Sequence, residues 1–112
     1  MNPSAKVQFY DVDEIDLHRK QSARSYEEFL RRPAMSAGLY VLPVGGVDPQ
    51  KPHHEGEVYY VVRGKARFKA DTEDQPVAAG SVIFVAAEVE HRFYDITEEL
   101  QILVFFAPAE SE

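Results

Sequence analysis

From Ala37 onward, the side chains follow a period of two, in short runs that glycine, proline and aspartate separate. The clearest run is residues 65–70, Lys-Ala-Arg-Phe-Lys-Ala, in which cations alternate strictly with small or apolar side chains. Such alternation predicts strands with one buried face and one solvated face. We therefore expect an all-β protein in which six or seven short strands form an antiparallel sandwich or barrel.

Turn residues set the limits of the expected strands. Gly64 indicates a tight connection between two of them, and residues 97–99 indicate a turn between the last two. Residues 81–86 are apolar on both faces. The strands are predicted at residues 38–42, 57–63, 65–70, 81–86, 91–96 and 100–106.

The N-terminal third has a different pattern. Residues 6–10 predict a short opening strand, and residues 11–24 are so polar that we expect mostly loop. Ser25-Tyr26-Glu27-Glu28 fits a capping box, and Phe29 and Leu30 share a helical face with Tyr26. This pattern predicts a short helix that ends at Pro33.

These elements form one structural domain in three parts. We interpret residues 1–36 as an N-terminal strand and helix that pack on a barrel of residues 37–108. Residues 109–112 are then an acidic tail.

Composition excludes several classes of function. The net charge of −7, from 19 acidic and 12 basic residues, argues against general nucleic-acid binding. The absence of cysteine excludes disulfides, thiol nucleophiles and thiolate metal sites. The N-terminus lacks the apolar core of a signal peptide, and no apolar run approaches a membrane span. We expect a cytoplasmic protein with no membrane partner.

Residues 52–64 concentrate the polar chemistry. Two histidines and two glutamates lie between His53 and Glu57, just before an apolar strand. Strand parity places His53 and Glu55 on the face of Glu57 and turns His54 to the opposite face. By the same rule, His91 shares a face with Phe93 and Asp95.

Two imidazoles and one carboxylate on one face predict a metal site at His53, Glu57 and His91, with coordination positions left open. Two other interpretations remain open. His91 alone is compatible with a hydrogen-bonded core histidine, and residues 53–57 with a solvated turn. His18 lies in a polar stretch and is expected at the surface.

The first stretch resembles motif one of the cupins, G-x5-H-x-H-x3,4-E-x6-G. His53, Glu57 and Gly64 reproduce the spacing of its second half, and Gly80 and His91 keep the spacing of motif two. The resemblance covers roughly residues 38–107 and implies a small, single-domain cupin of the conserved-barrel type. Its fold would be a double-stranded β-helix, the jelly-roll barrel.

The chain departs from the family pattern at position 51, where Lys51 replaces the usual first histidine. The family's ligand set of three histidines and a glutamate therefore carries over as His53, Glu57 and His91 with one vacancy. Gln50 is one candidate for a fourth ligand. Glu55, His54 and water are the alternatives.

The resemblance implies one divalent transition metal (Fe, Mn, Zn or Ni) and a dioxygenase-like enzyme, with isomerase or lyase activity as variants. The substrate would be a small organic molecule, and Glu55 would move protons as the catalytic residue. Parity places Tyr59, Phe68 and Phe93 in an apolar pocket wall. The alternative is a non-catalytic small-molecule binder or sensor. A homodimer through edge strands is expected in either case.

Overall fold

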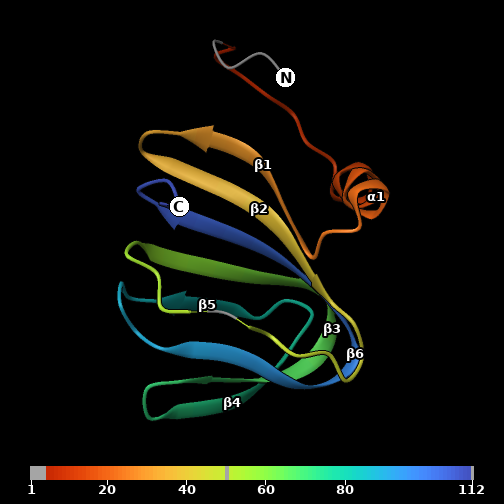
Figure 1. Ribbon diagram of the computed structural model, residues 1–112, viewed down its shortest axis with the longest axis vertical. Helices are drawn as coiled ribbons and strands as arrows, with labels where there is room; N and C mark the ends of the chain where they lie inside the picture. Colours follow the sequence, from red (N-terminus) through yellow and green to blue (C-terminus); the bar gives the residue numbers. More distant parts are fainter. Residues whose placement is uncertain (1–4, 50, 112) are drawn as a thin grey trace.

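Two long, bent strands, β3 (Gly56–Ala70) and β6 (His91–Ala107), carry the architecture and pair antiparallel along most of their lengths. The structure is a computed structural model that describes residues 5–49 and 51–111. The sheet has the order β1-β2-β6-β3-β4, and β5 pairs with β3 off this path. The remaining elements are α1 (Val12–Ser22), β1 (Tyr26–Arg32), β2 (Met35–Leu42), β4 (Glu73–Ala78) and β5 (Val82–Val85) (Figure 1).

β3 and β6 each contribute to both halves of the barrel. In the first half of β3, Glu57 pairs with Phe106 of β6 and with Val85 of β5. In the second half, Phe68 pairs with Phe93 of β6 and with Gln75 of β4. Figure 1 shows both strands bending, so that the two halves of the sheet face each other. The expected all-β barrel with one short helix is confirmed.

The bends explain why we predicted separate strands where the chain has continuous ones. Gly64 has a φ of +104° and lies where the β3–β6 register shifts, so it bends β3 and does not end it. Asp95 has a φ of +50° inside β6, and the expected turn at residues 97–99 is part of that strand. A positive φ favours glycine or aspartate whether the chain turns or only bulges. The sequence pattern therefore did not distinguish a hairpin from a bend.

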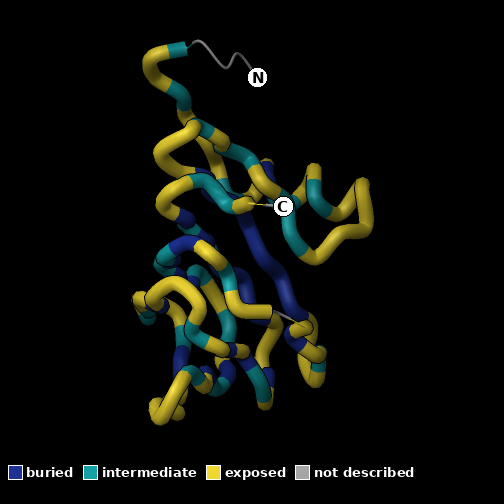
Figure 2. Tube along the Cα trace, turned by 60° about the vertical axis from the view of Figure 1, so that its left-hand side comes forward, coloured by how far each residue is buried: buried dark blue, intermediate teal, exposed yellow. Residues whose placement is uncertain are grey.

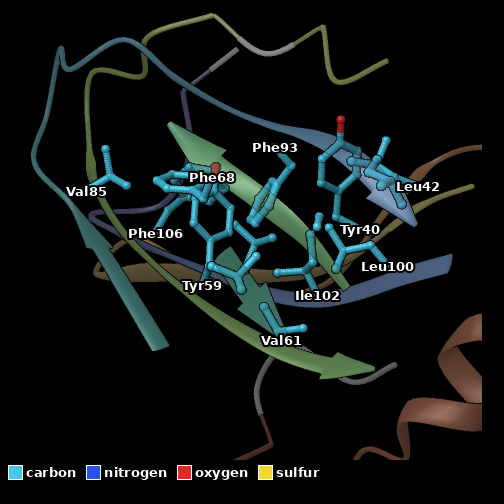
Figure 3. Close-up of a cluster of buried hydrophobic side chains, with 14 residues drawn as sticks. Tyr40, Leu42, Tyr59, Val61, Phe68, Val85, Phe93, Leu100, Ile102 and Phe106 are labelled. Atoms are coloured by element: carbon cyan, nitrogen blue, oxygen red, sulfur yellow. The ribbon is translucent and has the colours of Figure 1, made fainter. Parts of the chain in front are cut away.

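The interior follows the predicted parity. Along β3, Glu57, Tyr59 and Val61 are buried, and the residues between them are more exposed. Figure 3 shows aromatic and aliphatic side chains from β2, β3, β5 and β6 meeting between the two halves of the sheet. Figure 2 shows the same division along the chain, with buried strand segments flanked by exposed loops.

The predicted positions of the N-terminal elements are wrong. The helix is α1, in the stretch expected to be loop, and its N-cap Asp11 accepts hydrogen bonds from the N–H groups of Asp13 and Glu14. Ile15 anchors α1 on Leu39 and Val41 of β2. This apolar contact, ion pairs within the helix, and the ion pairs of Asp13 with Arg63 and of His18 with Glu27 offset its polar composition.

The segment expected to be helical is strand β1. Its residues pair with β2, for example Tyr26 with Tyr40 and Glu28 with Gly38. Tertiary pairing therefore overrides the capping-box pattern, as local helix signals are weak. Residues 6–10 form no strand. The division of the chain at residue 36 stays an interpretation, since β1 joins the sheet of the barrel.

The outer face of β5 is not covered. Val82 and Phe84 are 67% and 71% exposed, beside Tyr60 of β3, which is 40% exposed. The strand is apolar on both faces, as its sequence indicates, although only one face enters the core.

Replacing Gly64 with alanine is predicted to destabilise the fold by about 3 kcal/mol. The new Cβ would collide with the backbone carbonyl of Glu99, and the positive φ would add strain. Gly56→Ala is the matched control on the same strand, because its Cβ meets only ordinary contacts and should change stability by about 0.5 kcal/mol. Urea unfolding of both variants measures the difference. Equal stabilities would contradict the role given to Gly64.

Candidate metal centre

Three predicted ligands converge at the open end of the barrel. His53 lies in the loop before β3, Glu57 lies in the first half of β3, and His91 begins β6. One potential ligand atom from each residue lies within 4.8 Å of the other two. The side chains of Glu57 and His91 are 1% and 0% exposed, and that of His53 is 19% exposed. The structure thus brings together the residues that parity and spacing selected.

His91 is oriented so that Nε2 points to the centre of the cluster. Its Nδ1 lies 2.8 Å from the carbonyl oxygen of Val89, which can only accept, so Nδ1 carries a proton. Nε2 lies 2.8 Å from Oε1 of Glu57 and 2.8 Å from the hydroxyl of Tyr59. In the neutral imidazole, Nε2 therefore has a lone pair directed at the site, as a metal ligand requires.

The buried carboxylate of Glu57 faces Nε2 of His91, and no other group among the described residues donates a hydrogen bond to it. Burial acts to lower the pKa of His91, but the contacts with Glu57 and the Val89 carbonyl raise it above its usual value. The negative potential that favours a proton on His91 also favours a metal cation at the same place. Two imidazoles and a carboxylate are a donor set that divalent transition metals accept. The residues present therefore fit a metal ion.

His53 is held by its backbone and by its ring. Its carbonyl oxygen accepts a hydrogen bond of 2.7 Å from the N–H of Glu88, which ties the loop to the turn before β6. Its ring packs edge-on against Phe106, with centroids 4.9 Å apart. Its Nδ1 lies 3.4 Å from a carboxylate oxygen of Glu110, near the end of the chain.

Other polar candidates from the sequence lie away from the cluster. The side chain of His54 is 77% exposed and pairs with Glu88, which raises the pKa of His54. Lys51 is exposed, and His18 is exposed and pairs with Glu27, as expected of a surface residue. Gln50, the candidate fourth ligand, lies outside the described residues.

Glu55 is buried on the Glu57 face, as parity predicted, but it is not part of the three-residue cluster. One of its carboxylate oxygens accepts a hydrogen bond of 3.0 Å from the N–H of Ser111. Burial acts to raise the pKa of Glu55, but the hydrogen bonds from Ser111 lower it below its usual value. Its proposed role in proton transfer stays a prediction, and the lowered pKa favours a base over an acid.

The three aromatic residues assigned to the pocket wall surround His91. The ring centroids of Tyr59 and Phe68 lie 5.8 and 6.0 Å from that of His91, and Phe93 packs against both. Figure 3 shows the three rings grouped in the hydrophobic interior. They are therefore core residues as well as neighbours of the site.

Sequence reasoning missed Asp48, which connects the ligand-bearing loop to the core. Its carboxylate accepts hydrogen bonds from the hydroxyl of Tyr40, at 2.6 Å, and from the N–H of Phe93, at 2.9 Å. Burial and the hydrogen bond to Asp48 raise the pKa of Tyr40 above its usual range. A lone aspartate in a loop gives no sequence signal for this role.

A cavity of about 880 Å³ opens beside the cluster. His91 and Asp48 lie in its wall, together with the cationic side chains of Lys69 and Arg92 and the acidic Glu88. Its lining is mainly polar. The cavity therefore gives a small polar molecule a place against the strand that carries His91.

The model of the cupin domain family matches residues 38–106. The chain belongs to the cupins. An uncharacterized protein from Streptomyces coelicolor is 45% identical over 102 residues, which cover 91% of this chain and 97% of the relative.

Two solved structures share the fold. The TT1209 protein from Thermus thermophilus has a TM-score of 0.70 at 22% identity and covers 92% of this cupin and 99% of its own chain. An RmlC-like cupin from Shewanella frigidimarina has a TM-score of 0.69 at 21% identity, with 75% of each chain covered. Among the described residues of this cupin, no helix is long and apolar enough to cross a membrane.

Metal content should depend on the cluster and not on histidine in general. Protein purified without chelator or histidine tag is expected to contain about one divalent metal per chain, and His53→Ala and His91→Ala should lose most of it. His54→Ala is the matched control, because His54 is adjacent in sequence and exposed. Elemental analysis measures all four proteins. Low metal in the wild type that does not fall further in the variants would rule out the site.

Proposed function

We propose that this cupin is a mononuclear metal-dependent enzyme of the dioxygenase-like type that acts on a small organic molecule. The observation that carries the proposal is the buried Glu57 carboxylate beside Nε2 of His91, with His53 completing a three-residue set. Such a set leaves coordination positions for other ligands. A structural barrel has no need of a buried carboxylate that faces an imidazole in its interior.

Each residue of the site has a definable task. His53, Glu57 and His91 would hold the metal, which would supply activation of the substrate or of dioxygen when bound. The Val89 carbonyl fixes the tautomer of His91, and the hydroxyl of Tyr59 lies 2.8 Å from the Nε2 that would bind the metal. Glu55, ionised and at the rim, is the candidate for removing a proton from a substrate.

The cavity beside His91 limits the ligand to a small molecule. Its polar lining and its two cations, Lys69 and Arg92, suit a polar organic molecule. The aromatic rings packed beneath the site exclude solvent from the opposite side.

A second candidate function is a non-catalytic binder or sensor of a small molecule. The replacement of the usual first histidine by an exposed Lys51 supports it, because fewer protein ligands weaken metal binding. The same cavity would then hold the ligand without chemistry. The two candidates share the fold and differ in whether the metal turns substrate over.

Oxygen consumption distinguishes the two functions. Iron-loaded protein is expected to consume dioxygen when small polar carboxylates, phenols or polyols are added, and Glu57→Gln should abolish this uptake. An oxygen electrode with His54→Ala as the control measures the effect. Stable zinc with ligand binding but no turnover under any condition would support the binder and contradict the enzyme.

The homodimer stays a prediction, and the exposed face of β3 and β5 supports a second copy of this chain as its partner. Val58 and Tyr60 of β3 pair with Phe84 and Val82 of β5 and form an outer row, which contains no charged side chain. Two copies that carry a net charge of −7 can approach through this row without bringing like charges together. Identical apolar faces favour a twofold interface.

Replacing Phe84 with glutamate is expected to convert a dimer to monomers, because it would place a carboxylate in the middle of the apolar interface. Leu17→Glu is the control, since Leu17 is also exposed, at 61%, but lies on α1. Light scattering of both variants and the wild type measures the mass. A monomeric wild type at all concentrations would overturn this prediction.

A further inference from the structure

The last described residues of the chain lie against the rim of the metal centre and form a strap, defined here as residues 109–111. Ala109 donates its N–H to the carbonyl of Pro33 at 3.4 Å, and Glu110 donates its N–H to Oγ of Ser36 at 2.9 Å. Ser111 donates its N–H to the carboxylate of Glu55 at 3.0 Å. Figure 1 shows the chain turning back beside the end of β2 after β6. Each residue of the strap is therefore fixed to a different part of the barrel.

Two of these anchor points lie next to the ligands. Ser36 is fully buried and pairs across the sheet with Phe106, which in turn pairs with Glu57. Glu55 is two residues before Glu57 on the same face and is also buried. The strap therefore contacts two buried residues, Ser36 and Glu55, that lie close to Glu57.

The side chain of Glu110 is directed into the site. One of its oxygens lies 3.4 Å from Nδ1 of His53, and its carbonyl accepts a hydrogen bond of 2.8 Å from the guanidinium of Arg31. The Glu110 carboxylate is half-buried. The contact places a carboxylate beside Nδ1 of His53, which is the most exposed of the three candidate ligands.

A carboxylate on the Nδ1 side of an imidazole has a known chemical effect. It fixes the proton on Nδ1, directs the lone pair of Nε2 to the metal and makes that nitrogen more basic. The Val89 carbonyl does the same for His91. The cluster would then contain two histidines with the same tautomer, each set by an oxygen on Nδ1.

We propose that Glu110 is a positioning residue of the metal centre, which the strap holds against Nδ1 of His53 so that Nε2 binds the metal. The inference rests on the proposed metal binding and adds a fourth protein residue to it. The residue is 19 positions after His91, outside every motif of the sequence analysis. The surrounding acids Glu28, Glu55 and Glu57 make this end of the barrel strongly attractive to cations.

Titration of metal-free protein with Co²⁺ tests the proposal, with visible absorbance as the readout of affinity and ligand geometry. Glu110→Ala is expected to weaken binding about 10- to 100-fold, as loss of such a partner does elsewhere. Glu110→Gln keeps an acceptor oxygen and should restore part of the affinity. Ser36→Ala removes one anchor of the strap and should give a smaller loss in the same direction.

Glu27→Ala is the matched control, because Glu27 contacts the exposed His18 as Glu110 contacts His53, but outside the cluster. It should leave the Co²⁺ affinity within about twofold of the wild type, and the thermal midpoints of the metal-free proteins should agree. A ¹⁵N NMR spectrum of metal-free protein should show that Glu110→Ala, and not Glu27→Ala, changes the tautomer of His53.

The outcomes separate the two proposals. Wild-type protein that binds no Co²⁺ would overturn the metal site and the role of Glu110 together. Wild-type binding with an equal affinity in Glu110→Ala would overturn only the role of Glu110. An equal loss in Glu110→Gln and Glu110→Ala would show that charge alone matters and would also overturn positioning through Nδ1.

Discussion

The carboxylate of Glu57 is costly to bury, and among the described residues the group that faces it at close range is Nε2 of His91. The contact with His91 compensates for part of that cost, and the raised pKa of His91 is its electrostatic consequence. A divalent cation between the two side chains would compensate for more of it. The remaining features of the site can be understood as supports for this pair.

Those supports come from segments far apart in the chain. The Val89 carbonyl sets the tautomer of His91, Asp48 ties the loop of His53 to Tyr40 and Phe93, and the strap approaches His53 from the other side. In all three supports the contact is made by an oxygen atom. The oxygens of Val89 and Asp48 accept hydrogen bonds, and the carboxylate oxygen of Glu110 in the strap faces a ring nitrogen of His53. Together they leave the ligands little freedom to reorient, which is the condition for a preorganised metal centre.

The sequence predicted what depends on local periodicity and missed what depends on distant partners. Alternation placed Glu55, Glu57 and Tyr59 on one face, and spacing brought His91 to the same site. The roles of Asp48 and Glu110 depend on contacts with residues 45 and 57 positions away, which no local pattern reports. The helix was misplaced for the same reason, since pairing with β2 and a cap at Asp11 decided the N-terminal elements.

Both halves of the barrel share β3 and β6, and this sharing determines when the proposed metal site can be assembled. Gly56 pairs with Ala107, and Ala70 with His91, so the site is complete only when the last strand has closed on a strand made much earlier. Contacts of such large sequence separation form late and slowly during folding. A nascent chain would therefore carry His53 and Glu57 without the third residue of the cluster until β6 has been made. Metal selection would take place in the finished barrel, where cavity shape and ligand geometry can discriminate between ions.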